Sequence, residues 1–127
     1  MDDTVLRLRE WLIFHQLVGF EHVVIYDNTQ GLDDYHQSPI YQVLKEFPED
    51  FVTHQPWPAR ICNNHRPGHA SPGERSSQYA AEASCRERYG PLTTWMAFID
   101  TDEYLTPMSK SENVADTTWI PILEVSQ

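Results

Sequence analysis

Hydrophobic and polar positions in the first part of the chain follow first a helical and then a strand pattern. Residues 4–18 carry apolar side chains every three or four positions, which predicts an amphipathic helix, and Gly19 suits the left-handed turn that ends it. Residues 22–26 are short, apolar and β-branched, which is typical of a strand buried on both faces. The turn-forming residues 27–31 end that strand.

The same alternation continues along the rest of the chain. Ser38, followed by Pro, is expected to cap a second helix, and residues 51–53 form a weaker strand candidate. Residues 55–73 are crowded with Pro, Asn, His and Gly, which predicts a long loop. A third helix is expected over residues 74–89, and residues 95–99 (WMAFI) read as a second strong strand, again apolar on both faces.

Helices and strands alternating in this order predict an α/β fold in which helices flank a mostly parallel sheet. With 127 residues the chain has room for one domain, over residues 1–127, in which residues 108–127 form a polar C-terminal tail. Hydrophobic residues make up 40% of the sequence, enough for a packed core.

Charge and hydropathy narrow the classes of partner. The formal net charge is -10, whereas a surface that binds nucleic acid needs clustered basic residues, so no nucleic-acid partner is expected. No stretch approaches the roughly 18–20 apolar residues that span a bilayer, and no signal peptide opens the chain. The chain is therefore expected to be soluble, in an unknown compartment, and any membrane attachment would need a segment absent from it.

Acidic and amide side chains follow the two strong strands. Asp27 and Asn28 come after residues 22–26, and the run Asp100-Thr101-Asp102-Glu103 comes after residues 95–99. In an open α/β sheet the ligand binds beyond the carboxyl ends of the strands, so parallel strands would gather these side chains at one edge. Asp and Asn also begin ordinary turns, which explains Asp27 alone equally well.

The acidic run points to a divalent cation. Three carboxylates within four residues repel one another unless a positive charge lies among them. Mg²⁺ and Mn²⁺ take oxygen ligands, commonly one or two carboxylates together with water and substrate phosphates. In an extended chain Asp100 and Asp102 point to the same side and Glu103 to the other. We therefore expect Asp102 and Asp100 to hold the metal and Glu103 to have a structural role.

Four separated blocks of the sequence resemble glycosyltransferase family 92. The blocks occur in the family's order and span roughly residues 8–105: Glu10-Trp11-Leu12-Ile13-Phe14-His15 with Gly19, Val24-Ile25-Tyr26-Asp27-Asn28, a helix carrying Gln78, Tyr79 and Cys85, and Trp95 to Glu103 continued by Tyr104-Leu105. The resemblance implies a GT-A-type nucleotide-sugar-binding fold, a UDP-sugar donor and Mn²⁺ or Mg²⁺.

The resemblance also implies roles for individual residues. Asp27, beside Asn28, would hold the nucleoside, and Asp102 would be the direct metal ligand. Asp100 would contact the ribose or the sugar. Arg75 and Gln78, which lie one helical turn apart, are expected to face the diphosphate of the donor, against the alternative that Arg75 is a solvated ion-pair partner on its helix.

The resemblance covers the donor-binding half of such an enzyme. It implies transfer of a hexosyl group, galactose being the expected sugar, to a glycan or glycoprotein acceptor. The acceptor site and a catalytic base are expected outside this chain, which we therefore expect to be part of a longer protein, and no residue here is assigned as the base. A full-length relative would be anchored in the Golgi membrane by one span.

Two other functions fit the acidic run. A metal-dependent phosphoesterase would need further His or Asp ligands at other strand ends, and a non-catalytic remnant would bind nucleotide weakly or only fold.

The predicted loop contains a spacing that resembles a zinc site, Cys62-x2-His65-x3-His69. The fourth ligand would be Cys85 or His54. The alternative is a plain polar loop with scattered histidines.

Cysteine, histidine and tryptophan positions leave further choices open. Cys62 and Cys85 either pair in an oxidising compartment or stay free thiols. His15, on the first predicted helix, is expected to be a half-buried, hydrogen-bonded residue and not a ligand. Three tryptophans are expected in the core, although the second, in a Pro-flanked loop, could instead stack on a base or a sugar: Trp11, Trp57 and Trp95.

Overall fold

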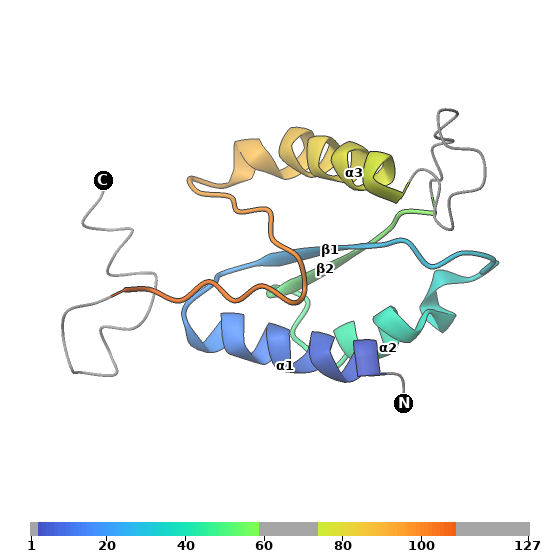
Figure 1. Ribbon diagram of the computed structural model, residues 1–127, viewed down its shortest axis with the longest axis horizontal. Coiled ribbons are helices and arrows are strands. Elements are labelled where there is room, and N and C mark those ends of the chain that lie inside the picture. The colour runs from blue at the N-terminus through green and yellow to red at the C-terminus, as the bar shows by residue number, and fades with distance from the viewer. Residues whose placement is uncertain (1–2, 59–73, 109–127) are drawn as a thin grey trace.

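A small sheet lies between two layers of helix in the computed structural model, which describes residues 3–58 and 74–108, apart from the side chains of residues 4 and 74–76. Two helices cover one face of the sheet and a third covers the other (Figure 1). In chain order the elements are α1 (Asp3–Leu17), β1 (Val23–Asp27), the 3-10 helix η1 (Tyr35–Gln37), α2 (Pro39–Leu44), β2 (Val52–Pro56), α3 (Glu74–Tyr89) and the 3-10 helix η2 (Gly90–Leu92).

The described sheet has two parallel strands. β1 pairs with β2 in a register that runs from Val23 opposite Val52 to Asp27 opposite Pro56. The crossover between them passes through α2, as a parallel connection requires. The predicted α/β fold with parallel strands and flanking helices is confirmed, whereas the GT-A-type arrangement stays a prediction.

The hydrophobic core lies between the sheet and the layer of α1 and α2. The helical periodicity of α1 places one apolar stripe on the sheet, and this stripe packs against α2 and both strands. The buried members are Val5, Leu8, Trp11, Leu12, Val23, Val43, Leu44, Phe51 and Val52. Hydrophobic burial therefore fixes the orientation of α1, and with it the direction of its polar groups.

Local signals set the ends of the helices as the sequence predicts. Gly19 has φ +98°, a left-handed conformation that suits glycine after a helix. The hydroxyl of Ser38 accepts a hydrogen bond of 3.1 Å from the amide of Ile40, and Pro39 takes the first helical position of α2.

The prediction of a doubly buried strand over residues 95–99 is wrong. This segment has no strand structure, and Trp95 and Phe98 are 54% and 40% exposed. β1 pairs with β2, and residues 96–101 lie across a cleft from β1. Because the cleft separates residues 96–101 from β1, no backbone hydrogen bonds join the two segments in the described part of the sheet. For the same reason the middle of β1 is only half-buried.

Several predictions concern residues outside the described part. Residues 59–73 of the expected loop over 55–73 are among them, and residues 55–56 belong to β2 instead of the loop. The zinc-like spacing and the Cys62–Cys85 pairing also rest on residues outside it, as does nearly all of the expected tail over 108–127. Among the described helices, none is both long and apolar enough to cross a membrane.

Candidate functional site

A cleft of about 890 Å³ opens between β1, α3 and residues 96–101. Its volume falls within the roughly 300–1,000 Å³ of small-molecule sites in proteins. Aromatic and aliphatic side chains form most of its wall, including Tyr26 from β1 and Trp57 after β2. Of the residues predicted for the donor site, Asn28, Gln78 and Asp100 line this cleft.

Trp57 and Asn28 join the carboxyl end of β1 to the start of α3. The Asn28 side-chain amide donates hydrogen bonds to the carbonyl of Trp57 at 2.6 Å and to the hydroxyl of Ser77 at 3.3 Å. The indole of Trp57 donates to the Ser77 carbonyl at 3.3 Å. Its ring also packs edge-on against Tyr26, with the centroids 5.3 Å apart. One end of the cleft is thus a corner that these hydrogen bonds hold together, with aromatic rings in its wall.

Tyr26 links the middle of the cleft to α3. Its hydroxyl lies 2.9 Å from that of Ser84, two turns along the helix from Ser77. Together with the corner at Asn28, this contact holds α3 beside β1 along the length of the cleft. Trp57, predicted either for the core or for stacking on a ligand, is half-buried and lines the cleft.

Asp100 to Glu103 form a turn, which we call the acidic turn. The amide of Glu103 donates to the Asp100 carbonyl at 3.0 Å, and the Glu103 carboxylate accepts from the Asp100 amide at 2.9 Å. The extended conformation from which we inferred that Asp100 and Asp102 point to the same side is therefore wrong. The structural role expected for Glu103 is confirmed, because its carboxylate closes the turn.

Gln78 and Asp100 meet although they are far apart in the sequence. The Gln78 side-chain amide on α3 donates a 3.1 Å hydrogen bond to the Asp100 carboxylate. Both side chains are exposed and both line the cleft. The side chain of Arg75, predicted to act beside Gln78, lies outside the described part.

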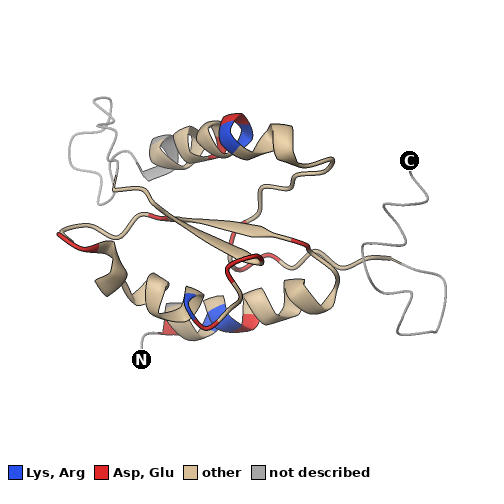
Figure 2. Cartoon of the chain, turned by 180° about the vertical axis from the view of Figure 1, so that it is seen from behind, with Lys and Arg blue, Asp and Glu red and all other residues tan. Residues whose placement is uncertain are grey.

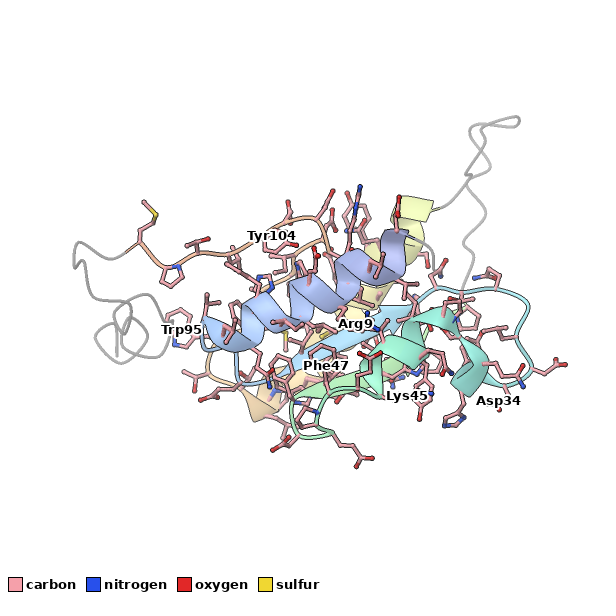
Figure 3. All side chains as sticks on the ribbon, turned by 90° about the horizontal axis from the view of Figure 1, so that it is seen from below. Arg9, Asp34, Lys45, Phe47, Trp95 and Tyr104 are labelled. Atoms are coloured by element: carbon pink, nitrogen blue, oxygen red, sulfur yellow. The ribbon has the colours of Figure 1, made fainter. Side chains whose placement is uncertain are left out.

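The opposite side of the acidic turn is held by α1. The indole nitrogen of Trp11 donates to the Glu103 carbonyl at 2.7 Å, and the Leu105 amide donates to His15 Nε2 at 3.3 Å. Tyr104 lies beside α1, where its ring is 5.0 Å from that of Phe14 (Figure 3). The acidic turn therefore lies between α3 and α1, in contact with both.

Asp27 is part of a buried hydrogen-bond network at the carboxyl end of β1. It is only 2% exposed. One carboxylate oxygen accepts from Ser38 at 2.5 Å and from His54 at 2.8 Å. The other accepts from the hydroxyl and the amide of Thr29, at 2.6 Å and 3.0 Å. The carboxylate thus joins both strands to the cap of α2.

The balance of burial and hydrogen bonding decides the charge of Asp27. Burial alone would raise its pKa, but hydrogen bonds from Ser38, Thr29 and His54 outweigh burial and lower the pKa below the ordinary value of an aspartate. The network therefore holds a charged carboxylate. Asp27 does not line the cleft, so the structure gives it an internal role, and its contact with a nucleoside stays a prediction.

The carboxylates of the acidic turn are oxygen donors of the kind that a divalent ion takes, but they do not enclose a site by themselves. Asp100 and Asp102 are both exposed. Within residues 3–58 and 74–108 no three His, Cys, Asp or Glu side chains gather closely enough to hold an ion by themselves. Lys and Arg side chains of this part lie on or beside the helices on both sides of the sheet (Figure 2). Because the described carboxylates are too few to enclose an ion, an ion at the acidic turn would need further oxygen ligands, such as the phosphates of a donor.

Three structural partners of the site were missed or misjudged from the sequence. Trp11 and His15 have the four-residue spacing that puts two side chains on one helix face, a signal that would have paired them. The expected hydrogen bonding of His15 is confirmed, but the residue is fully buried. Trp11 is in the core as predicted, whereas Trp95 is not. His54 had no local signal, because its contact with Asp27 depends on strand register.

Comparison of the sequence with known proteins identifies its family. The sequence model of glycosyltransferase family 92 matches residues 1–122. A curated protein of Oryza sativa subsp. japonica, described as a glycosyltransferase family 92 protein, is 33% identical over 109 residues. The aligned region covers 80% of this chain and 15% of the rice protein, and no solved structure matches the chain. Because the family model matches nearly the whole chain, the chain belongs to glycosyltransferase family 92.

Proposed function

We propose that this chain binds the nucleotide-sugar donor of a glycosyltransferase, a UDP-sugar, in the cleft between β1 and α3. The enzyme would transfer a hexosyl group, galactose being the expected sugar, to a glycan or glycoprotein acceptor. The observation that carries the proposal is the hydrogen bond between Gln78 and Asp100, because both residues line one cleft and both are expected, from separate motifs of the sequence, to contact the donor.

The walls of the cleft suit the two ends of such a donor. Trp57 and Tyr26 offer flat apolar surface on which a uracil ring can pack. The Gln78 amide is a neutral donor that can turn from Asp100 towards a phosphate oxygen. The Asp100 carboxylate, thereby released, can accept a hydrogen bond from a ribose or sugar hydroxyl.

A divalent ion suits the acidic turn on the chemistry of its donors. Asp102 and Asp100 supply hard oxygen ligands, and Mn²⁺ or Mg²⁺ commonly takes one or two carboxylates alongside substrate phosphates. When bound, the ion would neutralise charge on the departing diphosphate. Since the described residues supply too few ligands to enclose an ion, we expect metal and UDP to bind together.

Calorimetric titration of UDP with and without Mn²⁺ tests this proposal. The expected result is UDP binding that depends on Mn²⁺, with little binding of Mn²⁺ alone. Asp102→Asn removes one charged ligand and should lower UDP binding in Mn²⁺ to the level measured with EDTA. Asp50→Asn makes the same chemical change in an exposed residue before β2 and should leave binding unchanged.

The other outcomes distinguish the alternatives. Absence of metal-dependent UDP binding would contradict the donor-site proposal and favour a non-catalytic remnant. Tight Mn²⁺ binding that UDP does not improve would instead favour a metal-dependent phosphoesterase. An equal loss in Asp102→Asn and Asp50→Asn would show a general charge effect in place of metal ligation.

A further inference from the structure

The acidic turn is attached to α1 by polar groups that project from one face of that helix. Trp11 and His15, one helical turn apart, contact the Glu103 carbonyl and the Leu105 amide. These backbone groups belong to the first and third residues after Asp102. Both side chains are themselves buried, with Trp11 4% and His15 0% exposed. The contacts therefore tie the turn to the hydrophobic core.

The two hydrogen bonds of His15 determine its tautomer. Nδ1 lies 2.8 Å from the Trp11 carbonyl, which can only accept, so Nδ1 carries the proton. Nε2 faces the amide of Leu105, which can only donate, so Nε2 must carry the lone pair. Only the neutral Nδ1–H form satisfies both contacts.

Aromatic rings enclose the imidazole and hold it in place. Trp11 and Phe14 of α1 and Phe20 after it have ring centroids 4.2, 5.1 and 5.0 Å from that of His15. Tyr104 stacks on it at 5.8 Å and is the titratable group among these rings. Burial lowers the pKa of His15, although the hydrogen bond to the Trp11 carbonyl raises it in part.

We propose that Trp11 and His15 are positioning residues that form a clasp on the backbone after Asp102 and so set the placement of the acidic turn for the donor. The role in donor binding rests on the proposed function. Gln78 on α3 contacts the exposed carboxylate of Asp100, at the start of the turn. The clasp contacts the end of the turn from the hydrophobic core. Without the clasp the turn would have to be ordered by the ligand, and that ordering costs affinity.

The tautomer of His15 tests the clasp directly in the unmodified chain. Nitrogen-15 NMR of the imidazole at neutral pH should show the Nδ1–H form, with Nε2 unprotonated. The Leu105 amide should be protected from exchange with solvent, and its protection factor, which corrects for the intrinsic pH dependence of amide exchange, should fall as the pH falls and Nε2 gains a proton. A neutral Nε2–H tautomer, or a charged ring at pH 7, would overturn the clasp because neither can accept from Leu105.

Trp11→Phe tests the effect on the turn and on the donor. The variant keeps an aromatic ring in the core but removes the donor to the Glu103 carbonyl. We expect faster exchange at the Leu105 amide and about fivefold weaker UDP binding in Mn²⁺, which corresponds to the loss of roughly one hydrogen bond. Trp95→Phe, at an exposed residue that does not line the cleft, is the matched control and should change neither.

Failure of the clasp and failure of the proposed function have different signatures. If the unmodified chain does not bind UDP, the donor-site proposal fails, while the His15 tautomer and Leu105 exchange still decide whether the clasp exists. If the unmodified chain binds UDP and Trp11→Phe binds it equally well, the positioning role is overturned. Slow Leu105 exchange that Trp11→Phe leaves unchanged would also overturn it.

Discussion

Replacing Ser38 by alanine should destabilise the fold through two contacts of one buried hydroxyl. Ser38 is fully buried, accepts from the Ile40 amide as the cap of α2 and donates to the charged Asp27 carboxylate. Loss of a helix cap costs about 1 kcal/mol, and loss of a hydrogen bond to a charged group costs about 1.5–3 kcal/mol. The two losses share one atom and are not independent, so we expect the free energy of unfolding to fall by about 2–3 kcal/mol.

Urea unfolding followed by tryptophan fluorescence measures this change. Asp34→Ala is the matched control, because Asp34 caps η1 through the His36 amide but its side chain is 53% exposed. Its loss should cost much less than that of Ser38, since water can replace the exposed contact. A Ser38→Ala effect below about 0.5 kcal/mol, or one no larger than that of Asp34→Ala, would refute the buried network as a source of stability.

The same network predicts a pH dependence. The folded pKa of Asp27 is lowered, so its contribution to stability is complete above the ordinary pKa of about 3.9 and is lost as the pH falls through the folded value. Ser38→Ala removes one cause of the lowered pKa and should shrink this acid-sensitive contribution. Equal acid sensitivity of the two proteins would contradict the role of Ser38 in holding the charge.

Three further predictions concern the rest of the fold. His15 has a lowered folded pKa, so stability should be complete above about pH 6.5 and decrease as the pH falls towards that lowered pKa, which a urea series in buffers from pH 7 to 5 measures. Gly19→Ala should cost about 1 kcal/mol in the same assay, because φ +98° strains any residue with a Cβ. Tyr26→Phe should cost about 1 kcal/mol, and a double-mutant cycle with Ser84→Ala should assign that cost to their hydrogen bond.

Local rules were sufficient for the three α-helices and for the position of the first strand, although the middle of that strand is only half-buried and not buried on both faces as predicted. The periodicity of residues 4–18, the cap at Ser38 and the left-handed turn at Gly19 depend on neighbours within a few residues. Neighbouring residues determine these features, because a helical face, a cap or a glycine turn is complete without knowledge of the tertiary fold. The sequence by itself also carried the family membership, through motifs whose order and spacing survive in a partial match.

Tertiary structure alone decided where the predicted site residues lie and what they contact. An apolar segment such as residues 95–99 becomes a strand only if a neighbouring edge accepts its backbone hydrogen bonds, and the cleft separates it from β1. Asp27 and Asp100 both follow apolar segments, yet their surroundings differ. Strand register and the cap of α2 bury Asp27, whereas a turn leaves Asp100 exposed at the cleft. The pairing of Gln78 with Asp100, and of His15 with Leu105, required the chain to bring distant residues together, and no pattern of hydrophobic and polar positions encodes those long-range distances.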